Sequence, residues 1–551
     1  MKGLRKHIWL FLAMLLPLGF VACSDNDNEP VREPEVLTPP SGGQEDNKKE
    51  YYTFKEAYIN QFCYDQMYYY YLWWKDIDTS NWMLNDDPIQ KVKSIRYEED
   101  RWTAAMEDIT PYTDTSAITN NTYGYDFQPY WADEEETHVM AVVSMVFPDG
   151  PADKAGLKRG SRIMKMNGRH IEHTNEDYNT LLSSPSLDLS VYDPETDTTK
   201  DIKMTPVNMH LDPVLFEKVF DCGGKKVGYF YFNDFNSFES CARLIEVAKK
   251  FKKEGVTELV LDLRYNGGGY VIIEELLASL LAPEANVKNG DLYQTAVYND
   301  SEYAKLLKQY YGEDYVNTYF TTKFNMESDK YSYDTSDANI GLNKIYALVT
   351  SGTASASEAI LVSLMPYMDV EVIGNRTLGK HCSGVMFEAR EYYQDNEDYL
   401  AELKKKDVTA YNKFMDEYWK YYSGWKNYVG KWGLYVMIST YADKNGKNPC
   451  RPNGIVPEIE IKDSPIELYP LGDDREAMLR AALTEAGYTD FTPLPESQSR
   501  SAEPWYGEPI VRKKEGKRIL SKPEIPMNIS SRSLGMRHGA WGWGIRYSGI
   551  Q

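Results

Sequence analysis

One segment restricts the fold of this 551-residue chain more than any other. Residues 258–264, with the sequence ELVLDLR, have the pattern of a buried strand and open directly into the glycine turn 266–269, NGGG. An apolar helical stretch then begins near Val271. A buried strand that passes through glycines into a helix is typical of α/β layers, in which helices pack on a mostly parallel sheet. The sequence therefore predicts an α/β core.

The residues on either side of this segment continue the same plan. Lys226–Phe232 alternates as a strand, and apolar residues recur at helical spacing over 241–251. Asn236 and Glu239 have the spacing of a capping box, so we expect the helix to begin there. The remaining strands are predicted at residues 344–350, 370–373 and 454–461.

Two short segments carry the candidate chemistry. The stretches 351–358 (SGTASASE) and 374–380 (GNRTLGK) place Ser355 at a helix start, 25 residues before Lys380. A serine hydroxyl is a weak nucleophile until a base removes its proton, and a lysine is such a base only while it is neutral. Burial away from carboxylates lowers the pKa of a lysine by several units. The pairing predicts a hydrolase in which Ser355 is the nucleophile and Lys380 is the base.

The glycine turn 266–269 supplies a third element. Hydrolysis through a tetrahedral intermediate needs N–H donors aimed at the developing negative oxygen, and glycine amides at a strand-to-helix junction are suited to that task. The seven histidines form no obvious triad, and no stretch has the spacing of a metal site, so we expect neither a metal nor a cofactor. His381 is the only histidine near the motif, and it is the alternative base.

The N-terminal residues predict export and a lipid anchor. Residues 1–22 combine basic residues with the apolar run 8–20, which is the pattern of a secretory signal peptide. The residues up to Cys23 resemble the lipobox of bacterial lipoproteins, which implies a lipidated cysteine that attaches the protein to a membrane. Residues 23–49 are rich in Pro, Gly and charge and are predicted to be a flexible tether. The predicted location is the outer membrane, with either the periplasmic or the surface face left open.

Charge and cysteine content narrow the remaining choices. A net charge of −22 argues against nucleic acid as a partner. Five cysteines remain besides Cys23, an odd number, so at least one of them must be unpaired and the connectivity cannot be assigned.

The chain divides into segments of different character. Residues 50–119 are aromatic with helical spacing, and they predict a small N-terminal helical domain. Two tyrosine-rich charged stretches, 289–339 and 388–432, interrupt the α/β plan, and the second is expected to cover or flank the active cleft. Residues 491–551 are predicted to be a mobile basic tail.

A resemblance to the PDZ domain becomes specific at residues 150–168, GPADKAGLKRGSRIMKMNG. They follow a predicted strand at 139–146, and they look like the short helix, the glycine turn and the strand leading to an Asn-Gly hairpin of that family. The resemblance implies a PDZ domain over 120–206 and a peptide-binding loop at Gly124, Tyr125, Asp126 and Phe127. Asp126 departs from the usual pattern, and its charge is expected to weaken the binding of a carboxylate. A β-rich domain without a ligand is the alternative.

Taken together, the motifs DLRYNGGG, SGTASASEA and TLGK resemble those of the C-terminal processing peptidases, also called tail-specific proteases. The resemblance covers about residues 50–490. It implies a multidomain α/β protein with a crotonase-like ββα serine peptidase core over 207–490, no metal, and protein or peptide substrates recognised through their C-termini. It also implies that Ser355 is the nucleophile and Lys380 the base, and that the N–H groups of Gly268 and Ala356 form the oxyanion hole.

One position departs from the family pattern. Family members often have a glutamine four residues after the lysine, where this chain has Gly384. If that glutamine orients the lysine, His381, Cys382 and Ser383 are the candidates to replace it. The departure also leaves a second hypothesis open, namely an inactive PDZ-bearing scaffold or peptide-binding lipoprotein. A third hypothesis, a carbohydrate-binding lipoprotein, follows from the aromatic content, although core packing explains the aromatic residues better.

Overall fold

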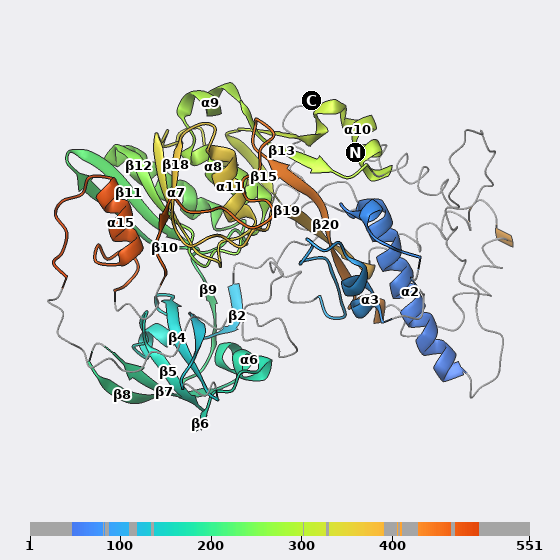
Figure 1. The fold of residues 1–551 in the computed structure, drawn as a ribbon, viewed down its shortest axis with the longest axis horizontal. Coiled ribbons are helices and arrows are strands. Elements are labelled where there is room, and N and C mark those ends of the chain that lie inside the picture. The colour runs from blue at the N-terminus through green and yellow to red at the C-terminus, as the bar shows by residue number, and fades with distance from the viewer. Residues whose placement is uncertain are drawn as a thin grey trace.

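The structure is a computed structural model. It describes residues 47–80, 82, 87–109, 118–133, 137–194, 196–300, 302–326, 330–390, 405, 408–409, 428–463 and 469–494. The strands of these residues form three larger sheets and two two-stranded ribbons. Each larger sheet occupies its own region of the molecule in Figure 1. We refer to them as the main sheet, the small sheet and the β20 sheet.

The main sheet has six strands in the order β10-β11-β12-β17-β18-β21. All neighbours from β11 to β21 are parallel, and β10 is antiparallel to β11. Because successive side chains of a strand point to opposite faces, β12 contributes to two cores. Leu259 and Leu261 belong to one core and Val260 to the other. The strands are β10 (Val214–Cys222), β11 (Lys225–Phe232), β12 (Val256–Asp262), β17 (Lys344–Val349), β18 (Asp369–Gly374) and β21 (Ile459–Glu460).

Helices cover both faces of the main sheet. Three of them pack with Leu259 and Leu261, and α15 packs with Val260 on the opposite face. The helices are α7 (Cys241–Glu254), α8 (Val271–Leu281), α11 (Ala356–Leu364) and α15 (Ala477–Glu485), and the short α9 (Glu284–Asn289) follows α8. Figure 1 shows α15 and the α7, α8 and α11 group separated by the strands. The predicted α/β core is therefore confirmed.

The predicted strands agree with the structure to within about two residues, except that only Ile459–Glu460 of the segment 454–461 is a strand. The predicted capping box is wrong. The helix begins at Cys241 with Ser240 as its N-cap, and the N–H of Asn236 donates to the Asp234 side chain in a turn that precedes the helix. An Asx turn competes with helix formation for the same backbone groups.

The small sheet contains the strands β3-β4-β5-β7-β8, and β6 pairs with β5. The predicted strand at 139–146 is confirmed as β4, and Asn167 and Gly168 form the predicted hairpin turn with positive φ angles of 50° and 78°. A ribbon of β2 and β9 leads into and out of this sheet. The elements are β2 (Ile118–Thr122), β3 (Tyr125–Trp131), β4 (Val139–Val146), α5 (Pro151–Lys154), β5 (Arg162–Met166), β6 (Arg169–His170), α6 (Asn175–Ser183), β7 (Leu187–Asp193), β8 (Thr198–Met204) and β9 (Val207–His210).

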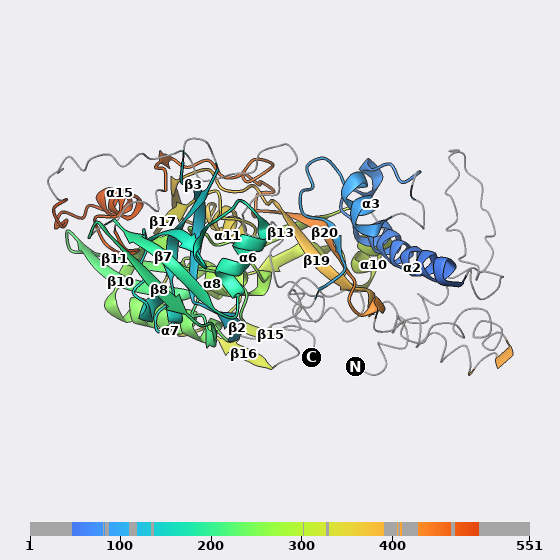
Figure 2. The same cartoon turned by 90° about the horizontal axis from the view of Figure 1, so that it is seen from below.

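The β20 sheet corrects the prediction of a separate N-terminal helical domain. Residues 104–106 form the strand β1, which pairs with the long strand β20, and Phe62 and Trp102 share one hydrophobic core with the main-sheet helices. Burial of these aromatic side chains against β20 explains why the segment does not form a core of its own. The N-terminal elements are α2 (Asn47–Tyr70), η1 (Trp74–Asp76), α3 (Pro88–Ile95) and β1 (Ala104–Met106). Both views show α2 and α3 beside β20 (Figures 1 and 2).

The remaining strands of the β20 sheet come from distant parts of the chain. They are β13 (Leu292–Tyr298), β14 (Asn317–Tyr319), β19 (Cys382–Glu388) and β20 (Gly433–Ala442). The first predicted insertion, 289–339, thus supplies two strands of this sheet. It also holds α10 (Glu302–Tyr311), η2 (Glu313–Val316), and the ribbon of β15 (Lys323–Met326) and β16 (Tyr331–Asp334).

Several predictions concern residues outside the described part of the chain. The signal peptide, Cys23 and most of the tether lie there, as do most of the second insertion, 388–432, and nearly all of the tail 491–551. Within the described residues, the five cysteines are all buried and unbonded to one another, and none of the helices has the length and apolar character needed to cross a membrane.

Candidate active site

Ser355 lies at the junction between β17 and α11, where a strained backbone presents its side chain. Its φ and ψ are 57° and −119°, and it is the N-cap of α11. A positive φ is unfavourable for a residue with a Cβ and persists where surrounding contacts impose it. The helix behind it is buried along its whole length, so the packing of α11 holds the turn in place. The predicted helix start at Ser355 is confirmed.

Glu358 connects the serine to the lysine. Its Oε2 accepts hydrogen bonds from the main-chain N–H of Ser355 at 2.9 Å and from that of Lys380 at 2.8 Å. Its Oε1 accepts from the N–H of Gly379 at 2.7 Å and from the Thr377 hydroxyl. Burial raises the pKa of Glu358, and the hydrogen bonds from Thr377, Gly379 and Ser355 oppose that rise.

The Glu358 carboxylate therefore joins the loop that carries Ser355 to the loop that carries Lys380. Sequence reasoning did not single it out. The signal was present, because Ser355 and Glu358 have the Ser-x-x-Glu spacing of a capping box.

The side chain of Lys380 is buried, with 1% of its surface exposed. Burial lowers its pKa to about 8, against smaller opposing effects from Cys382, Asp100 and Glu358. Its Nζ donates to the Tyr435 hydroxyl at 3.1 Å. Within the described residues this is the hydrogen bond that the amine makes, and none joins it to the Ser355 hydroxyl. The structure thus supplies the burial that a neutral lysine requires.

The N-terminal segment forms one wall of the lysine site. The Nζ of Lys380 lies 5.9 Å from the centre of the Trp102 ring. Arg101 donates from Nη2 to the carbonyl of Leu378 at 2.8 Å, and the Thr103 hydroxyl accepts from the N–H of Met437 at 3.1 Å. These contacts span more than 270 residues of sequence, so local spacing had no means of predicting them.

The glycine turn lies against the serine. A methyl group on Gly268 would lie 2.8 Å from the Cβ of Ser355 and 2.9 Å from the nitrogen of Ala356. Only glycine lets the turn lie this close to Ser355 and Ala356. The φ of 94° at Gly268 also favours glycine, because residues with a Cβ rarely adopt it. Ala356 is the first residue of α11, so its N–H has no acceptor within the helix. The structure thus brings Gly268, Ser355 and Ala356 together.

The N–H of Gly268, which was predicted to belong to the oxyanion hole, is engaged in the structure. It donates to the side-chain oxygen of Asn266 at 2.9 Å. Asn266 also binds the turn that carries Ser355, because its carbonyl accepts from the N–H of Ala354 and from the Ser357 hydroxyl, both at 3.0 Å. Asn266 is fully buried and holds the two loops in register.

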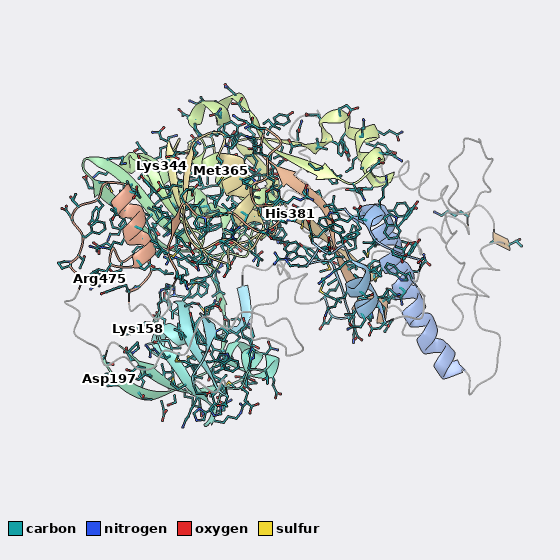
Figure 3. All side chains as sticks on the ribbon, in the orientation of Figure 1. Lys158, Asp197, Lys344, Met365, His381 and Arg475 are labelled. Carbon is teal, nitrogen blue, oxygen red and sulfur yellow. The ribbon has the colours of Figure 1, made fainter. Side chains whose placement is uncertain are left out.

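A buried charge network lies where the small sheet meets the main sheet. Arg159, which follows α5, donates to the Tyr265 hydroxyl at 2.7 Å and to Asp463 at 2.8 Å. Tyr265 also donates to Asp463 and has a φ of 63° directly before Asn266. In Figure 3, Lys158 lies on the part of the small sheet that is nearer to the main sheet. The network therefore links the small sheet to the start of the glycine turn.

The predicted peptide-binding loop begins at Gly124, whose φ is 72°. Its neighbours on β3 are engaged with α6 and with one another. The Tyr125 hydroxyl donates to the carbonyl of Leu181 at 2.7 Å, and the Phe127 ring centre lies 5.2 Å from that of Tyr178. The carboxylate of Asp126 accepts the N–H of Phe127 at 2.9 Å. The charge that departs from the family pattern thus binds a main-chain amide of the loop itself.

His381, the alternative base, packs among aromatic rings. Its Nδ1 lies 3.2 Å from the carbonyl oxygen of Gly379, and burial lowers its pKa. Its ring lies edge-on to Trp73 and Trp102, and among the described residues no hydrogen bond joins it to Ser355. Figure 3 shows it between the main-sheet helices and the N-terminal elements. In the described residues, no group of His, Cys, Asp and Glu side chains has the geometry to hold a metal ion.

Two regions of the chain match known protein families. Residues 226–461 match the family model described as peptidase family S41, and residues 131–191 match that of the PDZ domain. The chain is 25% identical over 259 residues to a carboxyl-terminal-processing protease of Picosynechococcus, covering 46% of this chain and 53% of that protein. It is 24% identical over 326 residues to a CtpA-like serine protease of Staphylococcus haemolyticus, covering 58% of each. The chain thus spans little more than half the length of these relatives.

A solved structure has the same fold. The crystal structure of a candidate S41 protease from Bacteroides fragilis superimposes with a TM-score of 0.55 at 24% identity, and the match covers 83% of this chain and 100% of that one. The strand-glycine-helix order, the serine turn and the lysine loop all fall within the region that the family model matches. Residues 226–461 therefore form a peptidase family S41 domain, and a PDZ domain precedes it in the chain.

Proposed function

We propose that this protein is a serine endopeptidase of the C-terminal processing type, in which Ser355 is the nucleophile and Lys380 is the base. The observation that carries the proposal is the arrangement around Glu358. One carboxylate oxygen accepts the N–H groups of both residues, while burial lowers the pKa of the Lys380 amine to about 8. An amine with that pKa is neutral in a useful fraction of molecules near neutral pH, which is the condition for a lysine base.

In the proposed reaction, the Ser355 oxygen attacks the carbonyl carbon of a peptide bond while the Lys380 amine takes the hydroxyl proton. The negative oxygen of the tetrahedral intermediate binds the N–H of Ala356, and that of Gly268 once it leaves the Asn266 side chain. Lys380 then gives its proton to the leaving amine. A water that Lys380 deprotonates finally hydrolyses the ester on Ser355.

The proposed substrates are exported, unfolded proteins whose C-termini the PDZ domain captures. A PDZ domain recognises extended peptides by strand addition, so it suits chain ends that have no fixed structure. The proposed peptidase core is crotonase-like. The proposed location is the outer membrane, through lipid on Cys23, and this part rests on the sequence pattern of residues 1–23.

The test compares cleavage of casein by the full-length protein and three variants. Ser355→Ala and Lys380→Ala should abolish turnover while circular dichroism shows an unchanged fold. Ser363→Ala is the matched control, because Ser363 lies on the same helix and its hydroxyl accepts from Gln294 instead of facing the site. A fluorophosphonate probe should label wild type at Ser355. Undiminished casein cleavage by Ser355→Ala would overturn the proposal.

One observation favours the second candidate, an inactive peptide-binding scaffold. In the described residues the Lys380 amine donates to Tyr435 and makes no bond to Ser355. Catalytic contacts often tighten only with substrate bound, and the proposed peptidase needs such a change whereas the scaffold does not. A scaffold would bind peptides through its PDZ domain, cleave none of them, and leave Ser355 unlabelled by the probe.

A further inference from the structure

We propose that Tyr435 is the residue that positions the base Lys380, and that Gly384 is a glycine because the Tyr435 side chain occupies its place. The inference rests on the proposed function, since it assigns a positioning residue to the same site. It also answers the question raised by Gly384, which stands where the family pattern has a glutamine. None of the three sequence candidates, His381, Cys382 and Ser383, supplies the partner of the amine in the structure.

The contact itself is direct and buried. The Nζ of Lys380 donates to the Tyr435 hydroxyl at 3.1 Å and lies 5.2 Å from the centre of its ring. Both side chains are 1% exposed. A buried amine without a partner would incur the full cost of desolvation, so this hydroxyl determines the direction in which the amine points.

The backbone at position 384 does not need a glycine, because Gly384 does not have a positive φ. A glycine is needed there because neighbouring side chains fill the space that a Cβ would occupy. A methyl group at position 384 would lie 2.7 Å from the Cζ of Tyr435 and 2.9 Å from its hydroxyl oxygen. It would also lie 2.1 Å from the Cε of Met437. Any larger side chain at 384 therefore excludes Tyr435 from its present position.

The strand register explains how Tyr435 reaches the lysine. β19 starts two residues after Lys380 and pairs antiparallel with β20, where Met386 is opposite Tyr435. Gly384 and Met386 point to the same face, so Tyr435 is the diagonal neighbour of Gly384 and passes over it toward Lys380. A register shift between Ser383 and Gly384 adjusts the alignment at this point.

The chemistry of a phenol suits a lysine base. Burial raises the pKa of Tyr435, so the hydroxyl stays neutral at the pH at which the lysine titrates. A neutral oxygen orients the amine without adding the negative charge that a carboxylate would bring, and a carboxylate would raise the pKa of Lys380. The hydroxyl still favours the protonated amine modestly, because it accepts a hydrogen bond from it.

The experiment measures the pH dependence of casein-peptide cleavage by Tyr435→Phe, which removes only the hydroxyl. We expect kcat to fall roughly 10-fold or more with KM nearly unchanged, because a positioning contact acts on the chemical step. We also expect the rising limb of the pH profile to shift to lower pH by about half to one unit. The protonated amine loses its hydrogen-bond acceptor, which lowers the pKa of Lys380. Tyr346→Phe is the matched control, since its hydroxyl donates to Glu258 within the main sheet and, among the described residues, makes no hydrogen bond to Lys380. An unchanged kcat and pH limb in Tyr435→Phe would overturn the proposal.

A pair exchange tests the role of Gly384. Gly384→Gln alone should lose activity and stability, because the new side chain and Tyr435 compete for one space. In the Tyr435→Ala background the same glutamine has room once the flexible end of the Met437 side chain shifts, and we expect it to restore activity at least 10-fold over Tyr435→Ala alone. Full activity of Gly384→Gln with Tyr435 present would contradict the proposed exchange.

A measurement that does not depend on enzyme activity tests the Tyr435 contact separately from the proposed function. The pKa of Lys380 is followed by NMR of protein labelled with ¹³C at lysine Cε, with Lys380→Met assigning the signal. If wild type proves inactive, the proposed function fails. A lower Lys380 pKa in Tyr435→Phe then still supports the contact, and an unchanged pKa overturns it.

Discussion

The main-chain N–H groups of Ser355 and Lys380 donate to a single oxygen atom, the Oε2 of Glu358, at 2.9 and 2.8 Å. The two residues are 25 positions apart, and in the described residues no hydrogen bond joins their side chains. The nucleophile and the base of the proposed reaction are therefore held in place through their backbones by one buried carboxylate. Proposed catalytic groups must be held in a defined geometry, and this carboxylate helps to fix the positions of both residues.

Glu358→Gln should lower kcat roughly 100-fold, because it weakens buried hydrogen bonds to a charged group that are worth about 1.5–3 kcal/mol each. The amide keeps the size of the side chain but offers only one acceptor oxygen. Steady-state kinetics on a fluorogenic peptide measures the effect. Glu274→Gln is the control, because Glu274 is equally buried on α8 and bonds to Tyr293. A loss of activity of the same size in both variants would contradict a specific role for Glu358.

Ser355→Gly should be more stable than Ser355→Ala by about 1 kcal/mol, although neither variant cleaves peptides. The φ of Ser355 is 57°, where glycine is unstrained and alanine is not. Urea unfolding of the two inactive variants measures the difference directly, without interference from self-cleavage. Equal midpoints would show that the turn at Ser355 stores no strain.

The activity should rise with pH through the pKa of Lys380, which burial lowers to about 8. The neutral amine is the reactive form, so below that pKa the rate should fall about tenfold per pH unit, and above it the rate should level off. Profiles of kcat/KM between pH 6 and 10 measure the limb. A limb below pH 6.5 would instead indicate a histidine base, for which His381 is the candidate because burial lowers its pKa.

Arg159→Met should disrupt the junction between the PDZ domain and the peptidase domain. It removes a shared partner of Asp463 and Tyr265. These two residues stay hydrogen-bonded to each other and Asp463 keeps Arg264 at 3.5 Å, so the loss of stability should be smaller than the about 3–5 kcal/mol typical of breaking a lone buried charge pair. We expect cleavage of short peptides to fall more than tenfold, because Tyr265 directly precedes the glycine turn.

The same variant should also show faster hydrogen exchange at residues 264–269. The control is Arg169→Met, which removes an ion pair to Asp177 within the PDZ domain. Normal activity of Arg159→Met would show that the junction does not affect the glycine turn.

Asp126→Asn should bind peptides with a free C-terminal carboxylate about tenfold more tightly, a gain of about 1.4 kcal/mol. The Asp126 carboxylate accepts the N–H of Phe127 and places a negative charge in the predicted binding loop. Calorimetry with matched acid and amide peptides measures the change. Equal gains for both peptides would indicate a general loosening of the loop.

The α/β core could be predicted from sequence because its signals are local. The strands β11, β12 and β17 are short runs rich in apolar residues, and each was located to within about two residues. The helix start at Ser355 could be predicted because serine is a preferred N-cap residue. The close contact of the glycine turn with that serine is possible because glycine has no side chain. The capping box at Asn236 failed for the opposite reason, since a turn competed locally for the same backbone groups.

The sequence alone determined which residues are candidates: a serine at a helix start, a lysine beside a glycine, and a glycine turn after a buried strand. Only the tertiary structure decided what surrounds them. Trp102 and Tyr435 reach Lys380 from segments 278 residues before it and 55 residues after it. Burial and hydrogen bonds of this kind depend on how distant elements pack. The periodicity of apolar residues shows which face of an element is buried, but not which distant element packs against it.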